Sequence, residues 1–166
     1  MCSSDLDADG NPLLNKVFSD GTAISTSDAC VYTPDHHMIL SGDIKTGNNR
    51  YSAHLLMSDT SGNQLWESTV GVRLNGGCKN TIIDSNNDLV VIGECATDSS
   101  SNFDIQINKI DIYSGAIKWS KFIRGSNESD AGFSILETAD HHYLLTGYGR
   151  SEEHTSELQS PDHLVC

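Results

Sequence analysis

The sequence has few basic residues, few prolines and no long apolar stretch, and each shortage excludes a class of protein. Its 10 lysines and arginines stand against 23 aspartates and glutamates, a formal net charge of −13, which argues against a protein that binds nucleic-acid phosphates. No apolar run approaches the ~18 residues of a membrane-spanning helix. The 3 prolines beside 14 glycines indicate many tight turns rather than long helices. Regularly spaced leucine, isoleucine and valine argue against wholesale disorder.

The sequence also lacks the short motifs of common catalytic sites. It contains no nucleophile elbow, no phosphate-binding loop, no HExxH motif and no CxxC pair. Its acidic residues fall mostly in turns and loops, so no Asp/Glu pair suited to acid–base chemistry can be selected. We therefore assign no catalytic, cofactor-binding or metal-binding residue, and we expect no cofactor.

The most informative pattern is a repeat of about 52 residues. The segment DADGNPLLNKVF recurs as DTSGNQLWESTV and IYSGAIKWSKFI, and its glycine recurs at intervals of 52 and 53 residues, as Gly10, Gly62 and Gly115. The segment PDHHMILSG recurs as SNNDLVVIG and ADHHYLLTG, and its last glycine recurs at intervals of 51 and 54 residues, as Gly42, Gly93 and Gly147. Two independent blocks with one period make a chance match improbable.

Each repeat contains four short apolar runs separated by turn residues. In the second repeat, Lys79–Asp84 and Leu89–Glu94 flank the polar turn Ser85–Asp88, which predicts a hairpin. Apolar and polar residues alternate through Asn102–Asp111, which predicts a strand with one buried face, formed by Phe103, Ile105 and Ile107. A further strand is expected at Ile117–Ile123. The connections are too short for crossover helices, so the strands should be antiparallel neighbours.

Four antiparallel strands per repeat predict an all-β fold, a partial β-propeller of four-stranded blades. The pattern resembles the secreted β-propeller-repeat proteins of bacteria. The matching residues are Lys109-Ile110-Asp111, Ser114-Gly115, Trp119, Lys121-Phe122 and the run from Ser134-Ile135 through Thr138, Asp140 and Tyr143 to Gly147. The resemblance covers nearly all of residues 7–149 and implies about two and a half to three blades: one strand of a first blade, complete units at Ser27–Val70 and Lys79–Ile123, and half of a last one.

The two ends share no pattern with the repeats. Residues 150–166, RSEEHTSELQSPDHLVC, resemble a translated DNA-sequencing adapter, and residues 1–6, MCSSDL, resemble the opposite adapter read in one frame. We therefore expect both segments to be adapter-derived and exclude them from the assignment of the fold. The expected propeller fragment is residues 7–149.

Two patterns resemble metal sites, and each has a simpler interpretation. Asp5–Gly10 fits the opening of an EF-hand loop, but Lys16 stands where the loop needs a bidentate glutamate, so we favour a β-turn. Where the family tends to carry Asp-Gly-Gly, this chain has Asp35-His36-His37 and Asp140-His141-His142, and the intervening repeat has no histidine pair. Histidine tolerates positive φ only modestly, so the sequence leaves open whether the turn type is the family's there. We interpret both pairs as solvated turn residues rather than zinc ligands.

The cysteines leave two readings open. Cys78 and Cys95 lie equally far from the centre of the predicted hairpin turn, so they should face one another across adjacent strands, where a disulfide is geometrically possible. They could equally be two small buried residues of a sheet. A disulfide would agree with an oxidising, extracellular compartment. Cys30 has no evident partner.

Three hypotheses for the function remain, and the third is a propeller subunit of an assembly whose function lies wholly in flanking domains. The regular structural residues without a convergent catalytic set favour a non-enzymatic scaffold or binding module, part of a larger secreted or cell-surface bacterial protein, whose loops bind a protein or carbohydrate partner. The remaining blades of the parent chain would be further partners, while no nucleic acid and no membrane span are expected. The alternative is a fragment of a quinone-cofactor-dependent dehydrogenase, because Trp66 and Trp119 resemble the blade motif of those propellers. In that family these tryptophans lock neighbouring blades together, so the match indicates packing.

Overall fold

A computed structural model describes residues 2–18, 26–47, 50–70, 75–96, 102–124, 129–149 and 156–158. Every regular element within these ranges is a β-strand, and all strand pairs are antiparallel, so the predicted all-β class is confirmed. The strands are β1 (Cys2–Leu6), β2 (Pro12–Val17), β3 (Ala29–Tyr32), β4 (Met38–Gly47), β5 (Arg50–Ser58), β6 (Gln64–Val70), β7 (Asn75–Ile83), β8 (Asp88–Ala96), β9 (Phe103–Asp111), β10 (Ile117–Ile123), β11 (Ala131–Glu137), β12 (Tyr143–Tyr148) and β13 (Ser156–Leu158).

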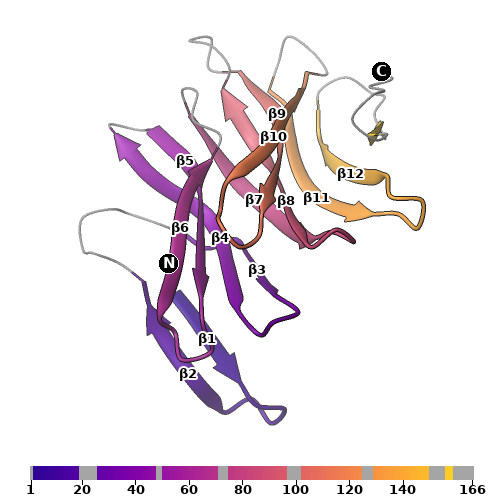
Figure 1. Cartoon of the computed structure of the whole chain (residues 1–166). Helices are drawn as coiled ribbons and strands as arrows, with labels where there is room; N and C mark the ends of the chain where they lie inside the picture. Colours follow the sequence, from indigo (N-terminus) through magenta and orange to yellow (C-terminus); the bar gives the residue numbers. More distant parts are fainter. Residues whose placement is uncertain are drawn as a thin grey trace.

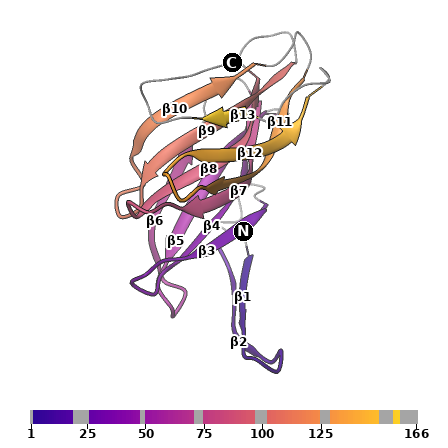
Figure 2. The same cartoon turned by 90° about the vertical axis from the view of Figure 1, so that its right-hand side faces the viewer.

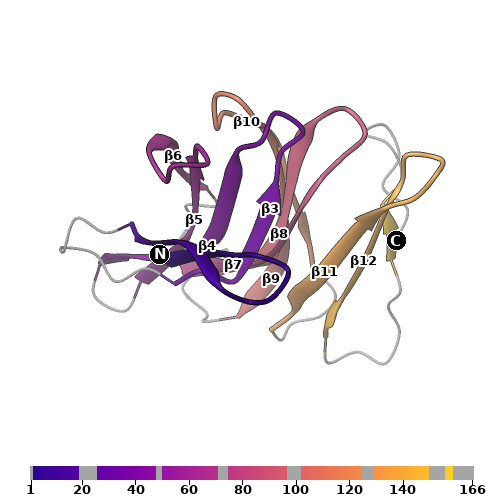
Figure 3. The same cartoon turned by 90° about the horizontal axis from the view of Figure 1, so that it is seen from below.

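The strands form four sheets in chain order. The first sheet is β1-β2, the second is β3-β4-β5-β6, the third is β7-β8-β9-β10 and the fourth is β11-β12-β13. Figure 1 shows the second, third and fourth sheets following one another, and Figure 2 shows the β1–β2 hairpin extending beyond them. The first strands of the three larger sheets, β3, β7 and β11, are neighbours (Figure 3). No closed sheet is present in the described part of the chain.

The predicted strands are confirmed, with ends that differ by a few residues. The second and third sheets coincide with the two complete units expected from the repeat. The first sheet departs from the prediction of a single strand, because Cys2–Leu6 pairs with Pro12–Val17. Residues 1–6 were expected to be adapter-derived, so no strand was assigned to them. The origin of the two end segments stays a prediction.

Strand β9 corrects one expectation, since both of its faces are buried. Asp104, Gln106 and Asn108 alternate with the apolar residues as predicted, yet they are only 4%, 6% and 3% exposed. The third sheet has a neighbouring sheet on each side, so no face of β9 is left to solvent. Buried polar groups need partners. The Asn108 side chain accepts hydrogen bonds from Gln106 (3.2 Å) and Ser120 (2.6 Å), and Arg124 pairs with Asp104 at 3.1 Å.

The first turn of each larger sheet has the same backbone geometry, although the side chains differ. In the second sheet the N–H of Thr33 donates to the carbonyl of His37, and the N–H of His36 donates to the carbonyl of Thr33. The same two bonds recur in the later turns, which begin at Asp84 and Thr138. The fourth residue of each turn has a positive φ: His36 (67°), Asn87 (58°) and His141 (65°). The two histidine turns therefore share the backbone geometry of the Asn87 turn of this chain.

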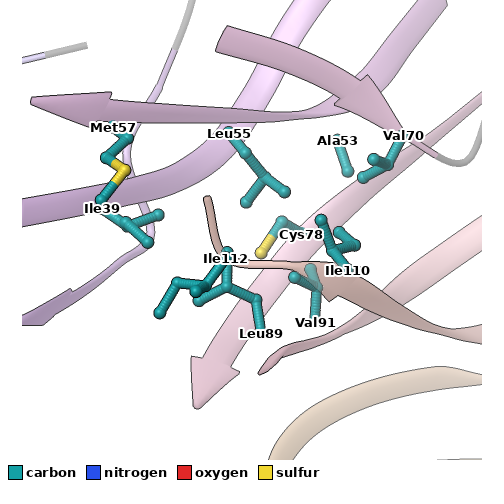
Figure 4. Close-up of a cluster of buried hydrophobic side chains, with 10 residues drawn as sticks. All are labelled: Ile39, Ala53, Leu55, Met57, Val70, Cys78, Leu89, Val91, Ile110 and Ile112. Atoms are coloured by element: carbon teal, nitrogen blue, oxygen red, sulfur yellow. The ribbon is translucent and has the colours of Figure 1, made fainter. Parts of the chain in front are cut away.

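The core lies between the sheets rather than within one. Strand β8 contributes alternate residues to two clusters: Leu89 and Val91 face the second sheet, while Val90 and Ile92 face the fourth. Figure 4 shows the first cluster, in which side chains of the second sheet meet those of the third; its members are Ile39, Ala53, Leu55, Met57, Val70, Cys78, Leu89, Val91, Ile110 and Ile112. A strand buried on both faces gains apolar burial on each side, so the sheets stabilise one another.

Adjacent sheets also meet through a repeated contact near the last turn of each repeat. A Cβ at Gly62 would lie 3.6 Å from the Leu14 side chain of the first sheet, and a Cβ at Gly115 would lie 3.0 Å from the Trp66 ring of the second. Leu14 and Trp66 occupy the same position of the repeat, and so do the two glycines. The indole N–H of Trp66 donates to the carbonyl of Ile112 at 3.2 Å. The predicted packing role of Trp66 is thus confirmed.

Candidate functional site

The densest polar cluster of the described residues lies between the third and fourth sheets, around Asp84. Its carboxylate lies 2.6 Å from the Lys109 ammonium and accepts a hydrogen bond of 2.6 Å from the Tyr143 hydroxyl. The other oxygen accepts the N–H groups of Asn86 and Asp88, at 2.9 Å each. The Lys109 side chain is only 13% exposed, so the pair is held away from solvent. This arrangement joins β9 to β12 through one carboxylate.

A second ammonium continues the cluster toward solvent. Lys118 of β10 pairs with Asp88 and, at 3.7 Å, with Asp111. Asp88 also lies 3.5 Å from Lys109, so it bridges the two lysines. Opposite charges alternate through the cluster, and each buried carboxylate has a cationic partner, as buried ion pairs require.

The surroundings shift the titration of the two groups that meet across the sheets. Burial alone would raise the pKa of Asp84, but the hydrogen bonds from Lys109, Tyr143 and Asp88 outweigh it and hold the pKa below its ordinary value. Burial, reinforced by the Asp84 carboxylate, raises the pKa of Tyr143 well above the ordinary value of a phenol. Tyr143 therefore stays protonated and donates its hydrogen bond, which makes it a fixed structural donor rather than an acid–base catalyst.

Next to this cluster, Ser85, Glu137 and His141 meet in an arrangement that resembles a hydrolytic triad. The Ser85 hydroxyl donates to Glu137 Oε1 at 2.7 Å and lies 3.0 Å from His141 Nδ1. His141 Nδ1 also lies 3.1 Å from the same Glu137 oxygen. In a triad the histidine contacts the acid with one nitrogen and the nucleophile with the other. Here Nδ1 meets both, so the imidazole cannot relay a proton between them.

The Ser85–Glu137 contact has a structural explanation. Glu137 Oε2 also accepts the backbone N–H of Ser85 at 2.6 Å, so the carboxylate clamps the first turn of the third sheet to β11. Burial would raise the pKa of Glu137, but the two bonds from Ser85 and the contact with His141 lower it overall. The carboxylate stays charged at neutral pH and holds the two sheets together.

The structure separates the two predicted histidine pairs. His37 Nδ1 lies 3.2 Å from Asp35, and His142 Nδ1 lies 3.2 Å from Asp140, each within its own turn. The ring of His36 lies 5.8 Å from that of Tyr32. Among the described residues, no three histidine, cysteine, aspartate or glutamate side chains are grouped as a metal site. The interpretation as turn residues agrees with these local contacts.

The acidic segment at Asp5–Gly10 forms the turn that the sequence favoured. The Asp7 carboxylate accepts the N–H of Asp9 (2.9 Å) and of Asn11 (2.8 Å). The Asp59 carboxylate makes the same bonds in the next repeat. Gly10 has a φ of 85°, a conformation that glycine adopts without a steric penalty. A carboxylate already bonded to its own turn explains the local Asp–Gly pattern.

The cysteines do not face one another as predicted. Cys95 pairs with Gly76, and Cys78 pairs with Gly93. The ladder pairs Ile83 with Leu89, so it is centred on Asn86 rather than between Asn86 and Asn87, and a β-bulge between Cys78 and Asn80 shifts the register further. The hairpin symmetry used in the prediction assumed a regular ladder. In the structure both are buried free thiols, while Cys30 is an exposed one. Burial raises the pKa of the Cys78 thiol to about 11, so it is protonated at neutral pH.

A smaller set of polar contacts joins the second and third sheets. The Asp43 carboxylate of β4 accepts the backbone N–H of Cys78 at 2.8 Å, and Thr81 donates to the Ser41 hydroxyl at 2.7 Å. Burial raises the pKa of Asp43 above its ordinary value, although the Cys78 N–H acts in the other direction. These groups join β4, the second strand of the second sheet, to β7, the first strand of the third sheet.

Sequence reasoning missed the residues that form the clusters. Lys109 and Tyr143 were recognised only as parts of a repeated pattern, and Glu137 was not selected. One signal was present: Asp84 stands at a turn position where the other repeats have Thr33 and Thr138. An aspartate in place of threonine marks the repeat whose turn contains a buried carboxylate. It does not reveal that Lys109 and Tyr143 are the partners of that carboxylate. The sequence Asn127-Glu128-Ser129 also fits the pattern of an N-glycosylation sequon, and its asparagine lies outside the described residues.

Comparison with known proteins does not assign the chain to a family. No family model matches the chain, and no curated protein matches it. Within the described ranges, no helix is long and apolar enough to cross a membrane. What the structure defines is a class of fold: antiparallel β-sheets of up to four strands, stacked in chain order.

Proposed function

We propose that the stacked sheets are blades of a β-propeller and that the chain is a non-enzymatic scaffold or binding module of a secreted or cell-surface bacterial protein. Three features support the propeller. The sheets are meanders of up to four strands, their first strands are neighbours, and the contact between Leu14 and Gly62 recurs one repeat later between Trp66 and Gly115. A propeller arranges four-stranded sheets radially in this way.

One observation supports a binding role: the first turn of each larger sheet has the same backbone conformation but exposes different side chains. His36, Asn87 and His141 occupy the same position of the first turn, share a positive φ and are exposed. A rigid turn with interchangeable side chains is a suitable recognition surface, because loops on a stable scaffold bind ligands without a cost in folding. Exposed imidazole and amide groups suit a protein or carbohydrate partner, since both offer hydrogen-bonding groups.

The polar clusters support a role without catalysis. Asp84, Lys109 and Tyr143 bond to one another between sheets, and Glu137 holds the turn at Ser85. These groups satisfy one another, so none is left poised for a substrate. We interpret these contacts as stabilising the packing of neighbouring blades.

The test measures binding and turnover on the same preparation. A glycan array and a polysaccharide panel are probed with the wild-type chain and with His36→Asn and His141→Asn, since Asn87 shows that asparagine fits this turn. We expect saturable binding whose affinity falls about tenfold in a histidine variant. A loss of this size corresponds to one charge-assisted hydrogen bond or to several neutral ones. Pyrroloquinoline quinone and calcium are then added with a dye acceptor. Oxidation of an alcohol or sugar would overturn the proposal in favour of the quinone-dependent dehydrogenase.

A further inference from the structure

One edge of the third sheet is formed by β10 and is open. The strand order is β10-β9-β8-β7, so β10 pairs with β9 on one side, and no strand of the described part of the chain pairs with its other side. Backbone N–H and C=O groups of alternate residues therefore point away from the sheet along a seven-residue strand. A strand of this length spans about 23 Å. Such an edge can accept an extended peptide by β-strand addition.

The composition of β10 favours pairing with a further strand. Most of its residues are β-branched or aromatic, the types that strands prefer: Ile117, Trp119, Phe122 and Ile123. Ile117 remains 46% exposed. The strand contains no proline, which would remove a backbone donor from the edge. The open side of β10 is therefore suited to forming a regular ladder.

The same edge concentrates positive charge in an acidic chain. The chain has 10 lysines and arginines, and four of them lie on β9, on β10 or directly after β10: Lys109, Lys118, Lys121 and Arg124. Lys118 and Arg124 pair with the buried carboxylates of Asp88 and Asp104, but their own side chains are 44% and 60% exposed. Solvent at this edge therefore meets the cations, while the carboxylates lie inside.

Lys121 is the cation of this edge that is left for a partner. Within the described residues it takes part in no ion pair, in contrast to Lys118 and Arg124. The corresponding strand of the second sheet, β6, contains no lysine or arginine and carries Glu67, which is 58% exposed. The two outer strands therefore differ in charge, and an acidic segment is attracted to β10 but not to β6.

We propose that β10 binds an extended acidic segment of a partner protein, which joins the third sheet as a fifth strand. Backbone hydrogen bonds to the open edge hold the segment, and its carboxylates lie beside the exposed ammonium of Lys121. The inference concerns a strand edge and holds whether or not the turns at His36 and His141 bind a ligand. Lysine on an edge strand can also serve to prevent pairing, so the experiment separates recruitment from protection.

The probe is a fluorescently labelled synthetic peptide of about eight residues composed of glutamate and valine. It is titrated with the complete chain and followed by fluorescence anisotropy. A control peptide keeps the glutamates but has proline at alternate positions, which removes the backbone donors. We expect saturable binding of the first peptide with a Kd on the order of 10–100 µM, weaker at high salt, and at least about tenfold weaker binding of the control. Absence of saturable binding, or equal binding of both peptides, would overturn the proposal.

Lys121→Glu tests the charge, because Lys118 and Arg124 also hold buried carboxylates and their loss would disturb the fold. It should weaken binding of the acidic peptide about tenfold, since attraction becomes repulsion. Lys45→Glu is the matched control: it changes the net charge equally, at another half-buried lysine that lies on β4 of the second sheet. Its affinity should stay within about twofold of the wild type. Equal losses in the two variants would indicate unspecific attraction and contradict a site at β10.

Lys121→Ser separates recruitment from protection. The affinity for the acidic peptide should fall about threefold, while light scattering gives the molar mass of the wild type. A variant that self-associates and binds the peptide as tightly as the wild type would show that Lys121 only protects the edge, which rules out the proposal. His36→Asn and His141→Asn should bind the peptide normally. A loss in these two variants would place the peptide at the turns, against this inference but in agreement with the proposed role of the turns.

Discussion

The glycine that ends each repeated PDHHMILSG-type block makes the sharpest test of the structure. At Gly93 of β8, an added Cβ would lie 1.8 Å from the carbonyl oxygen of Gly77 and 2.8 Å from its carbonyl carbon. The obstructing atoms are backbone of the neighbouring strand, so no side-chain rotation relieves the clash. The same geometry recurs at the other two glycines of this position. An added Cβ would lie 2.0 Å from the Thr26 carbonyl oxygen at Gly42 and 2.2 Å from the Ala131 carbonyl oxygen at Gly147. Each glycine lets the second strand of its sheet lie close to the backbone in or just before the first strand.

We predict that Gly93→Ala lowers the free energy of unfolding by about 2–4 kcal/mol. The figure lies at and above the upper end of the range of about 1–3 kcal/mol for overpacking a close-packed interior, because the clash is with backbone and β7 and β8 must separate by more than ~1 Å. With a urea m-value of ~2 kcal/mol/M, the midpoint should fall by about 1–2 M. The assay is urea unfolding followed in parallel by tryptophan fluorescence and far-UV circular dichroism.

Gly47→Ala is the control for this prediction. At Gly47, near the end of β4, an added Cβ would meet only the Arg50 Cβ at 4.0 Å, an ordinary contact. Its φ lies outside the left-handed region, so alanine adopts the same backbone, and the stability should change by less than about 0.5 kcal/mol. Equal midpoints for Gly93→Ala and Gly47→Ala would refute the close approach of β7 and β8.

Three further changes test the contacts between sheets. Trp66→Phe removes the indole donor to Ile112 and should cost about 1 kcal/mol, measured by thermal unfolding. Lys109→Met leaves the buried Asp84 carboxylate without its nearest cation and should cost about 3 kcal/mol in urea; an unchanged midpoint would contradict the buried pair. Because the folded pKa of Asp84 lies below its ordinary value of 3.8, its stabilisation is present above that pH and is lost as the pH falls through the folded pKa. Urea midpoints between pH 7 and 3 should therefore fall less steeply for Asp84→Asn than for the wild type.

The repeat and its turns could be predicted because their causes are local. A turn needs a left-handed residue and a capping side chain within a few positions, and Gly10, Gly62 and Gly115 show this directly. Alternation along β9 likewise located a strand. The prediction that Cys78 faces Cys95 failed because the centre of the hairpin and the β-bulge after Cys78 depend on how two strands meet, and nothing in the local pattern of Cys78–Cys95 reveals either.

The sequence by itself determined the strand positions, the hairpin connections and the acidic, turn-rich character of the chain. Only the tertiary structure decided which polar residues are buried and with whom they pair. Asp84 is separated from Lys109 by a turn and a strand, and from Tyr143 by 59 residues, more than a whole repeat, yet the three meet in one network. The face of β9 that alternation predicted to be solvated is covered by the adjacent sheet. Side-chain periodicity reports the local backbone conformation, whereas burial and charge pairing arise from the stacking of sheets that lie far apart in sequence.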